Sequence, residues 1–200
     1  MFFKTADITK FISENYKLIL IVLVFPMGIV VSMICFDYVK SSENVIIQII
    51  SKQYEIKETQ SVKSCFLNNL TMFSIYLSSA FLCGVCALGI PVIPILPFLY
   101  GMNVGYQVTY LYTTYGAKGV GYTALMVVPL SVIFAMIITF ASNEALNMSA
   151  EIFTCVQDNK KAKIDLLVYV KRFAVFLVLT IAFTALFSFI NTGLAKIITP

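Results

Sequence analysis

The sequence predicts an all-α integral membrane protein: a bundle of five transmembrane helices with one or two amphipathic helices at the membrane interface. Of the 200 residues, 60% are hydrophobic and only 12% are charged, whereas about a quarter of a soluble domain is charged. The 54 residues from Ser64 to Ala117 contain no Asp, Glu, Lys or Arg. They provide room for two crossings of about 20 residues each and the turn between them. Two further uncharged runs cover 18–36 and 173–195.

The first predicted span is the apolar run 18–36. It is longer than the apolar region of a usual signal peptide, and no small-residue cleavage site follows it, so we expect an uncleaved transmembrane helix. Pro26 removes one backbone hydrogen bond and is expected to kink this helix. The whole chain, 1–200, is expected to form a single membrane domain.

The longest predicted polar loop, 37–63, contains four acidic residues and four lysines. Its apolar residues recur at three- and four-residue spacing: Val45, Ile46, Ile49, Ile50 and Tyr54. This spacing predicts an amphipathic helix over about 43–56. Two interpretations stay open for that helix: it covers the bundle end or the membrane surface, or it is a docking surface for a partner outside the membrane.

The second predicted span, 68–89, starts with two polar intramembrane residues, Asn68 and Asn69, and ends in the turn Gly89-Ile-Pro91. Its small side chains let helix backbones approach closely. Three prolines then follow at intervals of three residues: Pro91, Pro94 and Pro97. Either Pro91 opens a helix that is kinked at the other two prolines, or 90–97 is an irregular connection buried in protein.

The third predicted span, 95–115, carries the close-packing motif Gly101-x-x-x-Gly105. Asn103 and Gln107 are polar intramembrane residues four apart on the same span. Two polar residues at this spacing indicate hydrogen bonds between helices more often than a substrate path.

A short glycine-rich turn, including Gly116, Lys118 and Gly119, leads to a fourth predicted span, 120–141, with a kink at Pro129. A second polar loop, 142–172, then precedes the fifth span, 173–195. Its acidic residues fall seven apart, which would align them along one solvated helical stripe: Glu144, Glu151, Asp158 and Asp165. We expect Glu144, the nearest to the membrane, to contact another helix.

Five spans place the two termini on opposite sides of the membrane. With the N-terminus inside, the cytoplasmic segments carry eight Lys and Arg residues and the outer segments carry six. The positive-inside rule therefore favours a cytoplasmic N-terminus, an extracytoplasmic C-terminus and an extracytoplasmic 37–63 segment.

Composition argues against enzymatic chemistry and nucleic-acid binding. The chain has no His, the commonest general base and metal ligand, and no dense basic run with interleaved aromatics. We expect no catalytic residue, cofactor or metal. Cys83-x-x-Cys86 lacks a second ligand pair, so we interpret both cysteines as small packing residues. A Cys35–Cys65 disulfide stays open, as does association into a homo-oligomer.

Several motifs of the central segment resemble the stage II sporulation protein M family. They are Gly89-Ile-Pro91, Phe98-Leu-Tyr-Gly101-Met-Asn-Val-Gly105, Gly116-Ala-Lys118-Gly119 and Pro129. Broader relatives carry a His-Gly motif in the fourth helix, which a chain without His cannot match, so the resemblance is to the sporulation branch of the family.

The resemblance implies a non-enzymatic membrane scaffold of the engulfment machinery at the septal membrane of the mother cell. It also implies partners that resemble stage II sporulation proteins D and P, which degrade peptidoglycan. An alternative from the sequence itself is a small permease or channel component, based on the three prolines and on Asn103 and Gln107. A continuous water-accessible cavity lined by these two residues would favour the alternative.

Overall fold

The computed structural model of the chain describes the backbone of residues 5–41, 62–158 and 165–198. Side chains are described within 18–36, 62–157 (apart from 122 and 126) and 165–190. The described residues are helical and contain no strand, which confirms the predicted all-α membrane protein. The long helices are α1 (Thr5–Ser41), α3 (Val62–Val85), α4 (Ile95–Tyr122), α5 (Val128–Asp158) and α6 (Leu166–Ile198). A 3-10 helix, η1 (Ala87–Gly89), follows α3, and a π-helix, η2 (Thr123–Val127), precedes α5.

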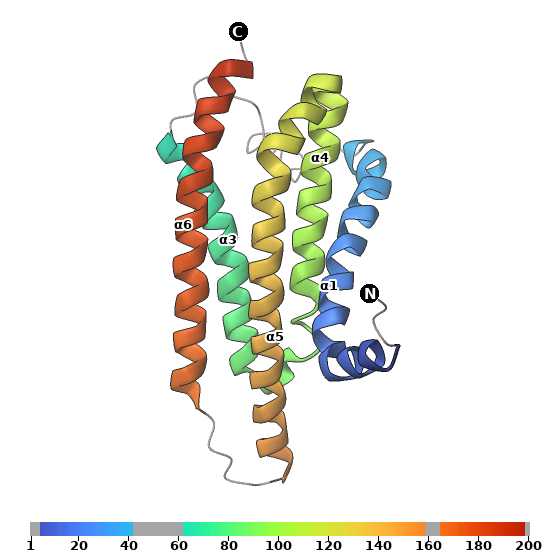
Figure 1. The fold of residues 1–200 in the computed structure, drawn as a ribbon, viewed down its shortest axis with the longest axis vertical. Helices are drawn as coiled ribbons and strands as arrows, with labels where there is room; N and C mark the ends of the chain where they lie inside the picture. The colour runs from blue at the N-terminus through green and yellow to red at the C-terminus, as the bar shows by residue number, and fades with distance from the viewer. Residues whose placement is uncertain (1–4, 42–61, 159–164, 199–200) are drawn as a thin grey trace.

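Within the described residues, four helical segments are long and apolar enough to cross a membrane: Leu18–Phe36, Val62–Val85, Val128–Gln157 and Leu166–Ile190. The sequence predicted five spans. The predicted third span lies in α4, which is not among the four, because Asn103, Gln107 and several hydroxyl-bearing residues lower its hydropathy. α4 nevertheless belongs to the bundle, where it packs against α1 and α5 (Figure 1).

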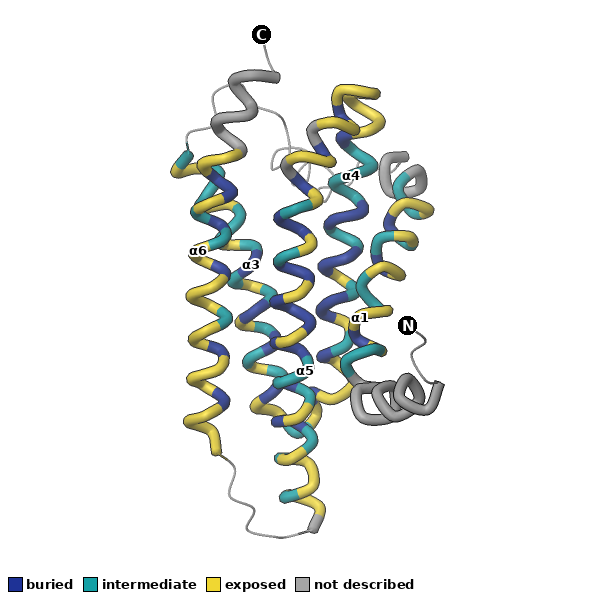
Figure 2. The backbone as a smooth tube through the Cα atoms, viewed as in Figure 1, coloured by how far each residue is buried: buried dark blue, intermediate teal, exposed yellow. Residues whose placement is uncertain are grey.

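Successive long helices run in alternating directions along the bundle, with α1 and α6 at its opposite edges (Figure 1). α5 lies between them and contacts α1, α3, α4 and α6. In the most apolar stretch of α5, 56% of the residues are buried, whereas only 17% are buried in the corresponding stretch of α1 (Figure 2). The core of the protein is therefore built around α5.

An aromatic cluster centred on Tyr100 joins four helices of the core. The ring centroid of Tyr100 lies 4.9 Å from that of Phe134, 5.5 Å from that of Tyr76 and 5.8 Å from that of Phe25. Phe73 stacks on Phe134 at 4.0 Å. Aromatic pairs at such distances contribute about 0.5–1.5 kcal/mol each beyond the burial of their surface. Because the rings come from α1, α3, α4 and α5, the cluster fixes how these helices meet.

The prediction of a polar loop over 142–172 is wrong, because α5 continues to Asp158 and α6 begins at Leu166. Ala145, Met148 and Ser149 recur at helical spacing within this segment and are buried. The segment is an amphipathic extension of a buried helix, which low mean hydropathy alone does not distinguish from a loop. The predicted single stripe of acids is accordingly divided between the two helices.

The connection from α3 to α4 is irregular. This agrees with the second alternative for the three prolines, an irregular connection over 90–97, and not with a helix that begins at Pro91. α3 ends at Val85 rather than at residue 89, and Pro94 is the N-cap residue of α4. Pro97 lies in the first turn of α4, where the N–H that it lacks has no helical partner in any case. The connection is not fully buried, since Pro91 is exposed.

The glycine-rich turn depends on one residue, Gly116, whose φ of 55° and ψ of −130° interrupt α4. Only glycine adopts this conformation without strain. Beyond it the chain folds back, so that Gly119 lies against the backbone of Leu111. The predicted fourth span thus begins in the last turn of α4 and passes through η2 into α5. The π-helical turn directly precedes Pro129, whose missing N–H disfavours regular α-helix there.

The amphipathic helix predicted over about 43–56 lies outside the described residues.

Candidate functional site: a polar pocket between α5 and α6

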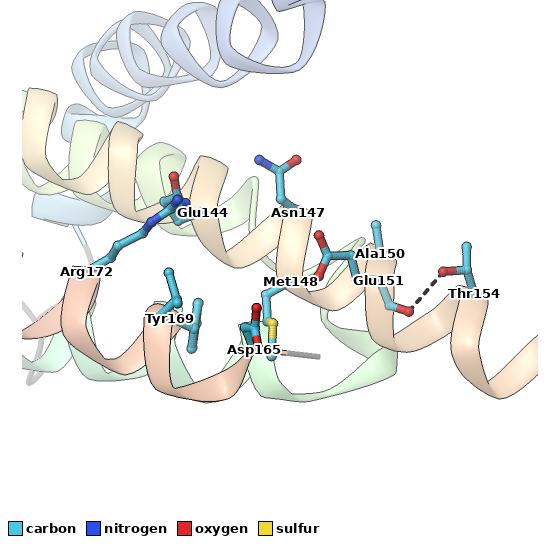
Figure 3. Close-up of a pocket in the computed structure, with 10 residues that line it drawn as sticks. Glu144, Asn147, Met148, Ala150, Glu151, Thr154, Asp165, Tyr169 and Arg172 are labelled. Atoms are coloured by element: carbon cyan, nitrogen blue, oxygen red, sulfur yellow. Dashed lines mark hydrogen bonds and ion pairs between the residues drawn. The ribbon is translucent and has the colours of Figure 1, made fainter. Parts of the chain in front are cut away.

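A pocket of about 600 Å³ lies between the last turns of α5 and the first turns of α6 (Figure 3). This volume falls in the range of small-molecule sites, about 300–1,000 Å³. Charged and polar side chains dominate its lining, among them Glu144, Asn147, Glu151, Asp165, Tyr169 and Arg172. The pocket therefore suits recognition of a polar or charged group.

Helical spacing explains how these side chains come together. Glu144, Asn147 and Glu151 are separated by three and four residues and share one face of α5. Asp165 immediately precedes α6, and Tyr169 follows it by four residues at the same spacing. The pocket forms where these two faces meet.

Glu144 on α5 and Arg172 on α6 both line the pocket and form an ion pair. The Arg172 guanidinium donates to the Glu144 carboxylate at 2.5 Å, and their side chains are 55% and 26% exposed. Exposure limits the pair to about 0–1 kcal/mol of stability, because water and salt screen the charges. The pair confirms the expectation that Glu144 contacts another helix.

Two further hydrogen bonds join α6 and α5, the helices that form the pocket, to α3 and the turn after it. The Tyr169 hydroxyl donates to the Phe81 carbonyl oxygen at 3.0 Å, and the Ser149 hydroxyl donates to the Cys86 carbonyl oxygen at 2.7 Å. Gly84 packs so closely on Tyr169 that a Cβ at this position would overlap the phenolic oxygen. α3, α5 and α6 are thus joined behind the pocket.

The arrangement provides charged and hydrogen-bonding groups for binding. Among the described residues, no three His, Cys, Asp or Glu side chains are grouped so as to hold a metal ion. The Thr154 hydroxyl donates to the Glu151 carbonyl oxygen at 2.9 Å within its own helix. Glu151 and Asp165 have no ion-pair partner in the described part of the chain.

Gly101 and Gly105, the predicted helix-packing residues, lie away from the pocket, at the contact of α4 with α1. A Cβ on Gly101 would overlap the Phe25 carbonyl oxygen, and one on Gly105 would lie 2.7 Å from the Ile29 carbonyl oxygen. On α1, Gly28 lies equally close to the backbone of α4. The two helices touch backbone to backbone because none of these three residues has a side chain.

The other motif residues are spread over both ends of the bundle. Gly89 is buried near the Ser149 hydroxyl and Pro91 is exposed, both between α3 and α4. Gly116 and Lys118 are exposed at the opposite reversal, where Gly119 is buried. Pro129 is half-buried at the start of α5. None of these residues lines the α5–α6 pocket.

The four predicted polar intramembrane residues also lie outside the pocket. Asn68 is exposed, and the amide of half-buried Asn69 donates to the Cys65 sulfur at 3.7 Å. Asn103 shares a hydrogen bond with Tyr76 on α3, so it joins two helices. Gln107 is half-buried.

All five cysteines are free thiols in the structure. Cys83 packs against the core, as predicted, but Cys86 is exposed, so the packing role proposed for it is wrong. The helix that contains Cys83 ends one residue before Cys86, which removes Cys86 from the packed face.

Sequence reasoning missed most of the pocket. Tyr169 and Arg172 were assigned to the polar loop 142–172, although their spacing from Asp165 places all three on one face of a helix. The recurrence of acidic residues every seven positions could have indicated that Glu144, Glu151 and Asp165 lie close together. It does not reveal that the chain reverses direction between Asp158 and Asp165.

Comparison with known proteins identifies a family for this chain. The sequence model of stage II sporulation protein M covers residues 21–194, a range that includes both the glycine contacts of α1 with α4 and the α5–α6 pocket. No curated protein and no solved structure shows significant similarity. Because the match extends over well more than half of the chain, this helical membrane protein belongs to the stage II sporulation protein M family.

Proposed function

We propose that the protein is a non-enzymatic membrane scaffold of the sporulation engulfment machinery, which anchors or localises peptidoglycan hydrolases at the septal membrane. The observation that carries this proposal is the family match over residues 21–194. The hydrolases would resemble stage II sporulation proteins D and P, the partners that the motifs around Gly101 and Gly116 imply.

The packing of the bundle supports a scaffold rather than a transporter. Backbone contacts at Gly28 and Gly101 and the ring cluster around Tyr100 hold the helices in close contact. In the described part of the chain, neither Asn103 nor Gln107 lines the α5–α6 pocket, and Asn103 is engaged by Tyr76. Close packing with bonded polar groups suits a framework that positions other proteins.

We further propose that the N-terminus is cytoplasmic and that the segment between α1 and α3 faces the hydrolases outside the cell membrane. The end of α1 and the start of α3 lie at one end of the bundle, and the α5–α6 pocket lies toward the other (Figure 1). Single-cysteine variants test this orientation with a membrane-impermeant thiol reagent. Cys65 should be labelled in intact cells and Cys155 only after lysis; the reverse pattern would exclude the orientation.

The scaffold proposal is tested by replacing residues 43–56 with a Gly/Ser linker of equal length. We expect the hydrolases to lose their septal localisation and to stop co-purifying with the protein, while the thermal unfolding midpoint of the bundle in detergent stays unchanged. A matched control replaces residues 159–164 with a linker of the same composition and should retain both properties. Normal hydrolase recruitment after the 43–56 replacement would rule out this segment as the docking site.

A further inference from the structure

We propose that Cys83 and Cys86, at the turn that follows α3, are a redox-active pair of thiols, which a low-molecular-weight disulfide converts reversibly into an intramolecular disulfide bond. Both side chains are free thiols in the structure. This modification is independent of the proposed recruitment of hydrolases by the segment between α1 and α3.

The end of α3 brings the two cysteines close together. The Cys86 backbone N–H donates to the Cys83 carbonyl oxygen at 3.2 Å, which closes a turn over residues 83–86 directly after the last helical residue, Val85. In helical geometry, Cα atoms three residues apart are separated by about 5 Å. Disulfides join Cα atoms about 4.4–6.8 Å apart, so the bond requires little movement of the backbone.

The turn lies at the depth of charged side chains and not of the lipid chains. The Ser149 hydroxyl on α5 donates to the Cys86 carbonyl oxygen at 2.7 Å, which places Ser149 beside the turn. On the same helix, Glu144 and Glu151 lie on either side of Ser149 in sequence, and both line the polar α5–α6 pocket. Because ionisable side chains are rare within the hydrocarbon region, we infer that polar reagents reach the exposed Cys86 from water.

The two thiols differ in exposure, which gives them different parts in the exchange. Cys86 is exposed, so its sulfur is the first to meet an incoming disulfide. Cys83 is half-buried and packs against the core, where a bulky reagent has less access. Cys86 is therefore the attacking residue, and Cys83 is the residue that resolves the mixed disulfide.

The exchange proceeds in two steps. The Cys86 thiolate attacks one sulfur of the reagent disulfide and expels the other as a thiolate, which takes up the proton that Cys86 has lost. The Cys83 sulfur then attacks the Cys86 sulfur, and the second small thiol leaves with the proton of Cys83. The two cysteines are oxidised to one disulfide, and the reagent is reduced to two thiols. Excess thiol reverses both steps.

Contacts with two other helices hold the turn in place, so the second step is intramolecular between groups that are already close. Gly84, between the two cysteines, packs against the Tyr169 hydroxyl of α6, and that hydroxyl donates to the Phe81 carbonyl oxygen at 3.0 Å. Positioned groups react at a high effective concentration. In the proposed orientation this turn faces the cytoplasm, where disulfides are usually transient and serve catalysis or redox sensing.

The experiment uses the full-length variant C35S/C65S/C155S in dodecyl maltoside, which retains only the two cysteines of the turn. Oxidised glutathione is added in excess, and the intact mass is measured. We expect the mass to fall by that of two hydrogen atoms with no glutathione attached, and to be restored by dithiothreitol. With C83A added, one glutathione should stay on Cys86. With C86S added, glutathione should attach at least about tenfold more slowly, because the remaining thiol is half-buried.

Retention of glutathione on both cysteines of C35S/C65S/C155S, or two unreacted thiols, would overturn the proposal. Covalent dimers on a non-reducing gel would also overturn it, since Cys86 would then join two copies of the chain. Thermal unfolding midpoints before oxidation verify that the variants are folded. Peptide mapping of the oxidised, unchanged protein gives an independent readout: Cys83 should be linked to Cys86, and a link from either of them to another cysteine would contradict the proposal.

Discussion

Gly101 on α4 lies directly against the backbone carbonyl of Phe25 on α1. A Cβ on Gly101 would overlap that oxygen and lie 3.3 Å from the Ile29 nitrogen. The contact is reciprocal, because a Cβ on Gly28 would overlap the Phe98 carbonyl oxygen on α4. The obstructing atoms are backbone atoms, which cannot move aside as a flexible side chain can.

The first prediction concerns this contact. G101A should destabilise the bundle by about 1–3 kcal/mol, because the two helices must separate to admit the methyl group. The thermal unfolding midpoint in detergent measures the effect. The control is G121A: a Cβ there meets no atom within 4 Å, so this variant should be neutral or slightly stabilising. Equal midpoints for G101A and G121A would mean that α1 and α4 do not pack as described.

The second prediction concerns the reversal after α4. Gly116 is exposed, and a Cβ added there would meet no atom within 4 Å. Glycine is therefore needed at this position for its backbone conformation and not for lack of space. With φ at 55° and ψ at −130°, G116A should cost about 1–3 kcal/mol of stability through backbone strain alone. Chemical denaturation of G116A beside G121A isolates the effect. A stabilised G116A would indicate that the helix continues through this position.

The third prediction concerns Gly84 and Tyr169 as a coupled pair. G84A should be destabilising because its methyl group would overlap the Tyr169 hydroxyl. Y169F should cost about 1 kcal/mol through loss of the hydrogen bond to Phe81. In the double variant the hydroxyl is absent, so G84A should cost less than it does alone. A double-mutant cycle measures this coupling, and strict additivity would contradict the packing of α3 on α6.

The fourth prediction concerns the Glu144–Arg172 ion pair. A cycle of E144Q, R172Q and the double variant should give a coupling of about 0–1 kcal/mol, since the Arg172 side chain is 55% exposed. Raising the salt concentration should reduce that coupling further. A coupling of several kcal/mol that does not depend on salt would instead require a buried pair.

The sequence predicts those features of the fold that depend on local pattern. Uncharged length predicts the apolar helices, and the four-residue spacing of Gly101 and Gly105 predicts a close contact of α4 with some neighbour. The identity of that neighbour is not predictable, because Gly28 on α1 becomes relevant only once the helices are arranged in space. Hydropathy also fails over 142–157, where one polar face and one buried face average to the value of a loop.

The candidate site was less predictable than the fold. Glu144 was expected to contact another helix, but its partner, Arg172, lies 28 residues away and depends on how α5 and α6 pack. Tyr169 carries no sequence signal for its bond to Phe81, since that bond joins elements 88 residues apart. The pocket arises from the packing of α3, α5 and α6, and no local motif encodes it.

The central claim, that this family member acts as a membrane scaffold for peptidoglycan hydrolases, is tested most directly by affinity purification from sporulating cells under mild detergent, with quantification of the hydrolases. We predict that the hydrolases are retained by the unchanged protein and by the control with residues 159–164 replaced, and lost when residues 43–56 are replaced by a linker. Failure of the unchanged, folded protein to retain any peptidoglycan hydrolase at any stage of engulfment would contradict the claim.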